Sequence, residues 1–405
     1  MTALLNRLVT KKITQTLANK KSVLLLGPRQ VGKSTLIKSI LSKNHRFDTI
    51  LLQNPRLRLL YEKSPGRLIQ EYELKGTSNT IFIDEIQKVP ALLDSIQYLI
   101  DELGKKFILT GSSARKLRPI RSGVNLLPGR LILHHLDPLM WAEVGLVKKN
   151  LILPIGMANI NDSSGYGVND SLVFGTLPEV VGLAPVQRRE LLQSYAVIYL
   201  EEEIRAEALS RNVGRFGSFL QLTAQESGTS PNMAKLSNQT GISILTIREY
   251  YQILVDTLVI HQLPPFIKNT RKRLTKTPKY YFFDLGVRNA LTEIPLEEKS
   301  INADKGRLFE HHVILEMFRR QRLTGNFQLY YWRTLSGLEV DLIIQTPKQL
   351  IPVEIKAAQN IRLADLSGLR AFLNEHRLKQ GYVVSLDEKP YRLDRRITVI
   401  PWNYC

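Results

Sequence analysis

The sequence predicts an α/β protein of two or three domains. Its 405 residues and hydrophobic fraction of 43% are enough to fill several cores. Short apolar runs typical of buried strands alternate with helical patterns over residues 1–150, and this alternation returns over 300–405. The stretch between them is mostly helical in pattern. We therefore expect an α/β domain at each end of the chain and helical segments in the middle.

A glycine-rich loop follows the apolar run Val23–Leu26 and precedes a helical pattern. At a helix N-terminus, glycines let consecutive backbone N–H groups turn inward on the β- and γ-phosphates of a nucleotide. Lys33 adds a point charge, and Ser34 adds a hydroxyl ligand for Mg²⁺. We therefore expect this segment to bind a nucleoside triphosphate through Gly27, Pro28, Arg29, Gln30, Val31, Gly32, Lys33, Ser34 and Thr35.

Two carboxylates, Asp84 and Glu85, end a second apolar strand that begins at Thr80. At the carboxyl edge of a parallel sheet both point at the nucleotide crevice. Asp84 can hold Mg²⁺ through water and Glu85 can polarise the attacking water, so hydrolysis is expected. A third strand over 106–109 ends in hydroxyl residues suited to sensing the γ-phosphate or orienting water, or to an ordinary turn; they include Thr110 and Ser112.

This order of phosphate loop, Asp-Glu strand and hydroxyl-tipped strand resembles the AAA+ ATPases. The resemblance implies ATP as the nucleotide and a homo-oligomer, expected to be a hexamer, in which an arginine reaches the γ-phosphate bound by a neighbouring subunit. We expect Arg130 in this role, although Pro128 stands where a small residue is typical. Competing finger candidates are Arg115, Arg118 and Arg121, and candidates for a second sensor arginine are Arg188 and Arg205.

The net charge is strongly positive, +19 at pH 7. This excess favours a polyanionic partner, and nucleic acid explains it more simply than a membrane surface does. The single cysteine, Cys405, excludes an intramolecular disulfide and fits a reducing compartment. The sequence has no signal-peptide pattern and no apolar stretch of about 18 residues. We therefore expect a cytoplasmic protein with DNA as its partner and no membrane span.

The middle of the chain changes character twice. Residues 151–175 are rich in Pro, Gly, Asn, Asp and Ser, which is typical of a linker, and a helical pattern then runs from Val186 to Asn212. From Phe216 to Phe283, three helical segments are followed by two extended segments. This succession predicts a winged helix whose extended segments pair as a hairpin.

The tip of that hairpin is basic, and no acidic residue occurs between Asp256 and Asp284. Such a tip would grip DNA phosphates without reading sequence. The alternative is a protein-packing helical module with a solvated lysine-rich loop. The predicted DNA-binding residues are Lys268, Arg271, Lys272, Arg273, Lys276 and Lys279.

The last hundred residues hold a second group of charged side chains. Glu310 is predicted on a helix, Asp341 on a strand, and Glu354 and Lys356 on the next strand, where residues two apart share a face. The arrangement resembles the PD-(D/E)XK nuclease superfamily. The resemblance implies Mg²⁺ held by Asp341 and Glu354 with support from Glu310, and Lys356 orienting a water for attack on a phosphodiester. A buried structural ion-pair cluster is the alternative.

From Val23 to the C-terminus the layout resembles a group of prokaryotic AAA+ ATPases with a C-terminal PD-(D/E)XK-like domain. Two functions fit it. One is an ATP-driven enzyme of DNA replication, recombination, repair or defence; the other is an ATP-gated binding protein whose C-terminal domain never cuts. The charge and the basic hairpin favour the first. The predicted domains are an ATPase domain over 1–150, a linker and helical lid over 151–215, a winged helix over 216–290 and a nuclease-like domain over 300–405.

Overall fold

The computed structural model divides the chain into two compact units. The N-terminal unit holds Asn6–Asp137 together with Ile253–Val259, and the C-terminal unit consists mainly of Pro138–Gln252 and Ile260–Cys405. None of the helices described is long and apolar enough to cross a membrane. The structure describes residues 5–42, 47–75, 80–113, 127–148, 151–153, 155, 157, 160, 165–196, 213–267 and 277–405.

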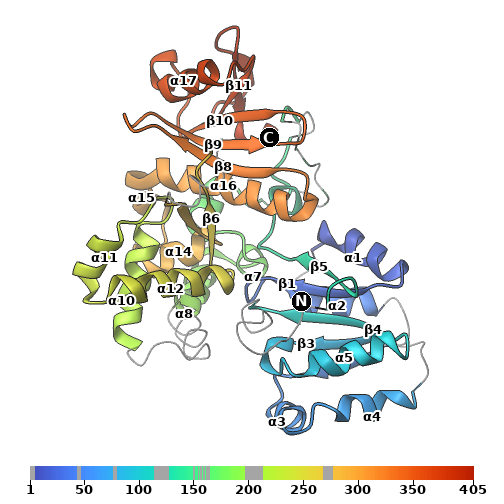
Figure 1. The fold of residues 1–405 in the computed structure, drawn as a ribbon. Helices are drawn as coiled ribbons and strands as arrows, with labels where there is room; N and C mark the ends of the chain where they lie inside the picture. The colour runs from blue at the N-terminus through green and yellow to red at the C-terminus, as the bar shows by residue number, and fades with distance from the viewer. Residues whose placement is uncertain are drawn as a thin grey trace. The chain divides into compact units, whose positions relative to one another are not determined.

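The N-terminal unit is built on a five-stranded sheet in the order β2-β3-β4-β1-β5, and every neighbouring pair is parallel. Central strands of a parallel sheet are covered on both faces, which explains why β1, β3 and β4 are nearly continuous apolar runs. The predicted parallel α/β architecture of this part is confirmed. The strands are β1 (Ser22–Leu26), β2 (Phe47–Leu51), β3 (Thr80–Asp84), β4 (Lys106–Gly111) and β5 (Leu131–His135) (Figure 1).

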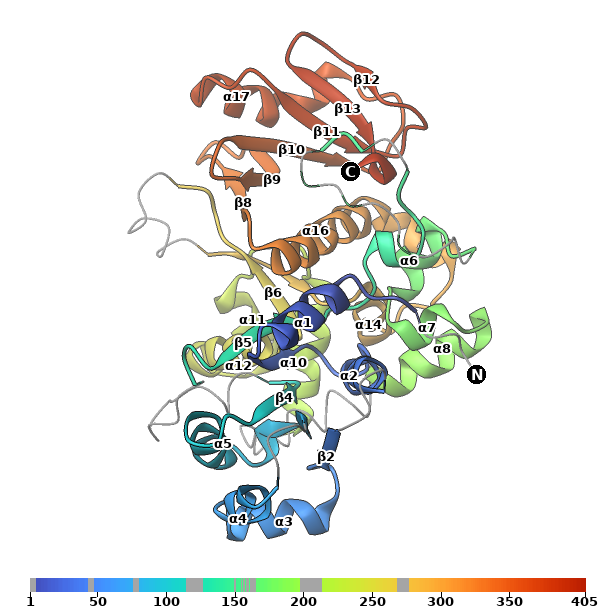
Figure 2. The same cartoon turned by 90° about the vertical axis from the view of Figure 1, so that its right-hand side faces the viewer.

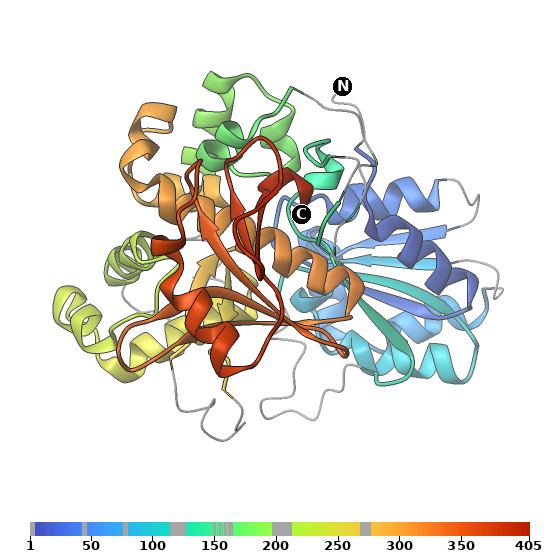
Figure 3. The ribbon, with the colours of Figure 1, turned by 90° about the horizontal axis from the view of Figure 1, so that it is seen from above.

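Helices cover both faces of this sheet (Figure 3). Their apolar sides join the strands in one core, to which the separate segment Ile253–Val259 contributes Leu258. Because β4 lies between β1 and β3, the carboxyl ends of these three strands meet at one edge. The helices are α1 (Val9–Ala18), α2 (Lys33–Leu41), α3 (Pro55–Lys63), α4 (Arg67–Glu73), η1 (Ile86–Lys88) and α5 (Leu92–Asp101).

The C-terminal unit begins with helices. The prediction of a linker over 151–175 is wrong for its last residues. Val168–Phe174 form the helix α6, which buries the apolar side chains of Leu172, Val173 and Phe174. Of the helix predicted from Val186, residues 197–212 lie outside the described part of the chain. The helices up to residue 304 are η2 (Trp141–Glu143), α6, α7 (Pro178–Val181), α8 (Pro185–Ser194), α10 (Val213–Gln225), α11 (Met233–Thr240), α12 (Ile244–Asp256), α14 (Leu285–Leu291), α15 (Glu298–Ile301) and η4 (Asn302–Asp304).

The three helices and two extended segments predicted between Phe216 and Phe283 form as α10, α11 and α12 and as the antiparallel pair β6 (Ile260–Leu263) and β7 (Lys279–Phe282). Asn232 caps α11 by accepting a hydrogen bond from the Lys235 backbone N–H, and Gly241 ends the helix in a left-handed conformation. The identification of this segment as a winged helix stays a prediction.

A six-stranded mixed sheet, in the order β12-β13-β11-β10-β9-β8, completes the C-terminal unit. The helices α16 and α17 cover opposite faces of it (Figure 2). Both α16 and α17 contact β10, so the central strands are buried on both sides. The elements are α16 (Lys305–Thr324), β8 (Gln328–Arg333), β9 (Glu339–Gln345), β10 (Leu350–Lys356), η5 (Leu363–Leu366), α17 (Ser367–Glu375), β11 (Gly381–Ser385), β12 (Tyr391–Arg392), β13 (Ile397–Pro401) and η6 (Trp402–Tyr404).

Two adjacent histidines are buried in α16. The His311 ring Nε2 lies 2.8 Å from the Phe282 carbonyl oxygen and therefore donates to it. The His312 ring packs against Trp141 and Trp402, with ring centroids 4.9 and 5.8 Å away. Burial, with a contribution from the charge of Arg319, lowers the pKa of both imidazoles to about 3. Both side chains are therefore neutral in the folded protein at any pH near neutrality.

We expect the two buried histidines to make the C-terminal unit less stable as the pH falls from about 6.5 toward 3. In that window an unfolded histidine takes up a proton and the folded one does not, so the free energy of unfolding falls by up to about 1.4 kcal/mol per pH unit for each histidine. His312→Phe should remove one of the two contributions. Urea unfolding followed by tryptophan fluorescence at pH 7 and pH 5 checks this, because all three tryptophans lie in the C-terminal unit. An equal pH dependence in the variant and the wild type would contradict it.

Candidate nucleotide site and carboxylate cluster

The glycine-rich loop connects β1 to α2. Gly27 follows β1 and lies so close to the segment after β5 that a Cβ atom there would be 2.0 Å from the Leu136 carbonyl oxygen, so only glycine fits. Gly32 precedes α2 with φ 89°, a left-handed conformation that glycine adopts without strain. The loop therefore lies at the carboxyl edge of the sheet, at the N-terminus of α2. Backbone N–H groups and the helix dipole make such a position attractive to phosphate.

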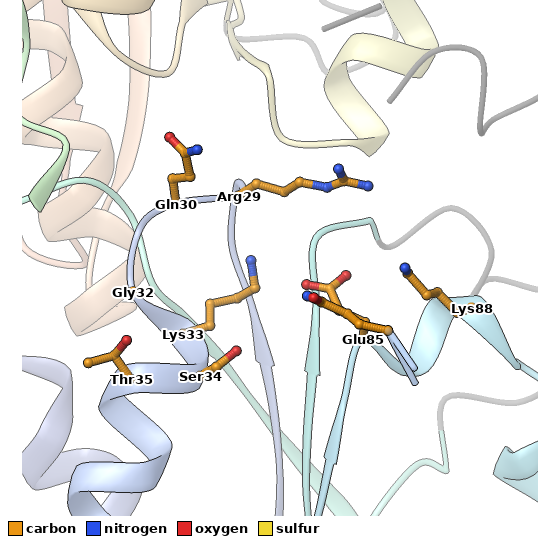
Figure 4. Close-up of a pocket in the computed structure, with 9 residues that line it drawn as sticks. Arg29, Gln30, Gly32, Lys33, Ser34, Thr35, Glu85 and Lys88 are labelled. Atoms are coloured by element: carbon orange, nitrogen blue, oxygen red, sulfur yellow. The ribbon is translucent and has the colours of Figure 1, made fainter. Parts of the chain in front are cut away.

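A cavity of about 360 Å³ opens beside this loop. Lys33 lines this cavity, and its ammonium donates to the carbonyl oxygens of Gly27 and Pro28 at 2.8 Å each. Figure 4 shows Lys33 and Ser34 on the side of the phosphate loop and Glu85 and Lys88 on the opposite side, with the Arg29 side chain extending from the loop toward Glu85. The residues that line the cavity are Arg29, Gln30, Gly32, Lys33, Ser34, Thr35, Gln53, Glu85 and Lys88.

Asp84 ends β3 next to the loop. The Ser34 hydroxyl donates to its carboxylate, with Oγ 2.8 Å from Oδ1 and 2.9 Å from Oδ2, and the Thr110 hydroxyl donates to the same Oδ1. A serine hydroxyl and a carboxylate are the oxygen ligands that Mg²⁺ takes in sites that also bind phosphate. The donor set at this corner therefore fits a magnesium ion held between the protein and a nucleotide.

Glu85 follows in a left-handed conformation, φ 61° and ψ 48°, which a residue with a side chain rarely adopts. Its carboxylate accepts hydrogen bonds from the Gln87 side-chain amide and from the Ser112 hydroxyl, and the Gln87 amide also donates to Ser112 at 2.9 Å. Glu85 is buried, yet it lines the cavity. The strained backbone and the two donors fix one orientation of a carboxylate that faces the phosphate loop.

Most of the loop residues predicted to bind nucleotide line the cavity, whereas Thr110 and Ser112 do not. Both hydroxyls are buried and hold the two carboxylates in place instead. Sequence reasoning missed four residues. Gln53 and Lys88 line the cavity, Gln87 holds Glu85, and Arg7 donates to the Val31 carbonyl in the loop at 2.9 Å. Only Gln87 and Lys88 carried a local signal, since they follow the acidic pair directly.

Arg130 stands just before β5, whose first residue pairs with Ser22 at the start of β1. It therefore lies at the sheet edge opposite the phosphate loop, about 13 Å away along a five-residue strand. Its guanidinium is about one-third exposed and donates to Asp101 at 2.6 Å. Arg188 pairs with Asp170 at 2.8 Å. The other arginines considered, Arg115, Arg118, Arg121 and Arg205, lie outside the described residues.

The predicted DNA-binding hairpin requires one correction. Lys279 is the first residue of β7 rather than part of the tip, and its side chain is only 9% exposed. Its ammonium contacts Glu310 at 3.1 Å and Glu339 at 2.5 Å. A lysine buried in this way cannot grip phosphates. The other five residues of that set, Lys268, Arg271, Lys272, Arg273 and Lys276, lie outside the part of the chain that the structure describes.

The carboxylates predicted in the C-terminal part do come together. Burial, reinforced by the negative charges of Glu310 and Glu354, raises the pKa of the Asp341 carboxyl well above its usual range. Asp341 accepts a hydrogen bond from the Ile355 backbone N–H at 2.8 Å. On β10, Lys356 donates to Glu354 at 2.8 Å, as expected of residues two apart on one face. We call Glu310, Glu339, Asp341 and Glu354 the carboxylate cluster.

The cluster does not fit the predicted Mg²⁺ as arranged. Among the described residues no group of three or more His, Cys, Asp or Glu side chains is placed to hold a metal ion. The Glu310 Oε1 atom already accepts from the Lys279 ammonium and from the Tyr281 hydroxyl, at 3.1 and 2.8 Å. Among the described side chains, the cations nearest these carboxylates are Lys279 and Lys356.

The fold and the site define a P-loop nucleotide-binding domain in the N-terminal unit. The family described as AAA domain matches residues 19–145. This part of the chain is therefore an AAA-like P-loop ATPase domain. Two families described as domains of unknown function, DUF8612 and DUF4143, match residues 166–298 and 305–405.

The chain is similar to uncharacterized proteins of Mycobacterium tuberculosis and Mycobacterium bovis. Each is 25% identical over 386 residues, which cover 94% of this chain and 79% of the relative. Among solved structures, a Walker-type ATPase of Pyrococcus abyssi is 17% identical with a TM-score of 0.47 and covers 71% of this chain and 96% of its own. AMPPCP-bound DnaA from Aquifex aeolicus is 15% identical with a TM-score of 0.25 and covers 60% and 85%.

Proposed function

We propose that this protein is a Mg²⁺-dependent ATPase that acts on DNA as a homo-oligomer. The observation that carries the proposal is the convergence of Lys33, the Ser34–Asp84 pair and the fixed Glu85 carboxylate on one cavity. The net charge of +19 supports a nucleic-acid partner. A panel of duplex, forked and four-way DNAs with ATP and Mg²⁺, scored for binding, strand displacement and cleavage, tests the proposal.

Each residue of the site has a distinct role in hydrolysis. The loop N–H groups and Lys33 bind the phosphates and oppose their charge. Ser34 and Asp84 would hold Mg²⁺, which neutralises negative charge on the phosphate oxygens. Glu85 accepts a hydrogen bond from the attacking water and orients it. Because Gln87 and Ser112 fix Glu85, its carboxylate needs no reorganisation before it acts.

We infer that Arg130 acts on the nucleotide of a neighbouring subunit. Its place at the sheet edge opposite its own phosphate loop supports action in trans. Arg130→Ala and Lys33→Ala subunits should each be inactive alone, whereas mixing them should restore part of the ATPase activity, because a mixed ring contains intact sites. Steady-state ATP hydrolysis across mixing ratios measures this. No recovery at any ratio, or a fully active monomer across a dilution series, would contradict it.

A second function is favoured by one observation. Lys279 contacts two members of the carboxylate cluster. This arrangement supports an ATP-gated binding protein whose C-terminal domain does not cleave. The two functions share the ATPase domain and differ in the fate of the DNA. ATP-dependent binding of the DNA panel with neither strand displacement nor cleavage would select the second.

A further inference from the structure

The carboxylate cluster concentrates negative charge in a buried place. Glu354 is 6% exposed, and burial together with the charges of Glu310 and Glu339 raises the pKa of its carboxyl, although Lys356 opposes this. The Glu354 Oε2 atom is buried and has no hydrogen-bond partner among the described residues. Carboxylates gathered in one buried place carry negative charge only if a cation lies close by, since each loses its hydration.

Lys279 supplies that cation from outside the helix and strands that carry the cluster. It enters from β7, where Leu263 on β6 is its antiparallel partner. Its Nζ atom is within 3.1 Å of Glu310 and 2.5 Å of Glu339, and it lies 5.6 Å from the centre of the Tyr331 ring. Burial alone would lower the pKa of Lys279, but the surrounding Tyr281, Glu310, Asp341 and Glu339 raise it well above the usual value. Two carboxylates of the cluster therefore contact this one ammonium directly.

Three of the four carboxylates of the cluster have hydrogen-bond or ion-pair partners besides Lys279 and Lys356. Tyr281 donates to the same Glu310 oxygen that Lys279 contacts, and Arg333 contacts Glu339 at 3.5 Å. Asp341 is held by the Ile355 N–H. A divalent ion would have to displace the Lys279 ammonium, which cannot diffuse away because it is part of the chain.

We propose that the Lys279 ammonium is the resident cation of the carboxylate cluster and excludes a divalent ion from it. The wild-type protein then binds no divalent metal at the cluster and does not cut DNA there. Removal of the Lys279 charge converts the cluster into a divalent-cation site. This inference is independent of the ATPase activity, because the cluster and the phosphate loop use different residues.

The test is a Mn²⁺ titration of the full chain without nucleotide, followed by calorimetry. Lys279→Met keeps the length of the side chain and removes the charge. This variant should bind one more Mn²⁺ ion per chain than the wild type does. The double variant, which combines Lys279→Met with Asp341→Asn, should not bind that additional ion. Ser34 and Asp84 are present in all three proteins, so any metal bound at the ATPase site cancels in the comparison.

Thermal unfolding gives a second readout. Without metal, Lys279→Met should unfold several degrees below the wild type, because the cluster has lost its cation, and Mn²⁺ should recover part of that loss. Lys279→Arg, which keeps the charge, should behave like the wild type in both measurements.

Two results would overturn the proposal. One is a Mn²⁺ ion bound by the wild type, or Mn²⁺-dependent DNA cleavage by it, that Asp341→Asn abolishes; this comparison does not require Lys279→Met to fold. The other is a folded Lys279→Met protein that binds no more Mn²⁺ than the wild type. Neither result bears on ATP hydrolysis, which is measured separately.

Discussion

Glu85→Gln should bind ATP as the wild type does and hydrolyse it at least ~100-fold more slowly. The amide keeps the size and most of the hydrogen bonds of the carboxylate but is too weak a base to polarise the attacking water. Asp84, Ser34 and Lys33 are untouched, so the phosphate and metal contacts remain. Binding of a fluorescent ATP analogue and steady-state phosphate release measure the two effects separately.

Two comparisons sharpen this result. Lys33→Ala should lose nucleotide binding itself, because the ammonium that lines the cavity beside the phosphate loop is gone. Gln87→Ala should bind ATP and slow hydrolysis less than Glu85→Gln does, since Ser112 still donates to the Glu85 carboxylate at 3.3 Å. If the wild type and Glu85→Gln hydrolysed ATP at the same rate, Glu85 would have no catalytic role.

Reversing Arg271, Lys272 and Arg273 to Glu should weaken DNA binding by at least about tenfold at low salt and make it less sensitive to salt. If each side chain contacts a phosphate, the slope of log affinity against log salt concentration should fall by about three. DNA of any sequence should be affected equally, because phosphate contacts carry no sequence information. Fluorescence anisotropy with labelled duplexes over a salt series measures both quantities.

The matched control reverses three exposed lysines elsewhere in the chain, Lys348, Lys379 and Lys389, to Glu, which changes the net charge equally. If overall charge alone attracted DNA, both triple variants would lose affinity to the same extent. A loss confined to the Arg271 set assigns the effect to the hairpin. If the variant with Arg271, Lys272 and Arg273 reversed bound DNA as tightly as the wild type, the alternative would be favoured, in which this segment is a solvated loop on a protein-packing module.

The nucleotide site could be predicted from the sequence because its signals are local. A phosphate loop needs glycine, lysine and serine at fixed spacing, and the carboxylates directly end an apolar strand, so periodicity alone places Lys33 and Asp84 at one sheet edge. The supporting contacts join distant segments. Arg7 reaches the carbonyls of Val31 and Asp137, and Ser112 reaches Glu85, and no local pattern indicates such pairs.

Lys279 shows why the C-terminal site was harder to predict. Its neighbours in the sequence are basic and aromatic, so charge patterning assigned it to the DNA-binding tip. Strand register decides otherwise, because its pairing with Leu263 makes it the first residue of β7 and directs its ammonium to Glu310, 31 residues away. The helix and strands that carry Glu310, Asp341, Glu354 and Lys356 were predicted correctly. The cation that neutralises their charge comes from another part of the chain.

The rate of ATP hydrolysis with and without DNA tests the central claim most directly. Purified wild-type protein should hydrolyse ATP only with Mg²⁺, and duplex, forked or four-way DNA at low salt should change that rate, because ATP turnover and DNA binding belong to one cycle. Raising the salt concentration should abolish the DNA effect before it abolishes the basal rate. A rate that no DNA alters at any salt concentration, measured on protein that hydrolyses ATP, would contradict the account.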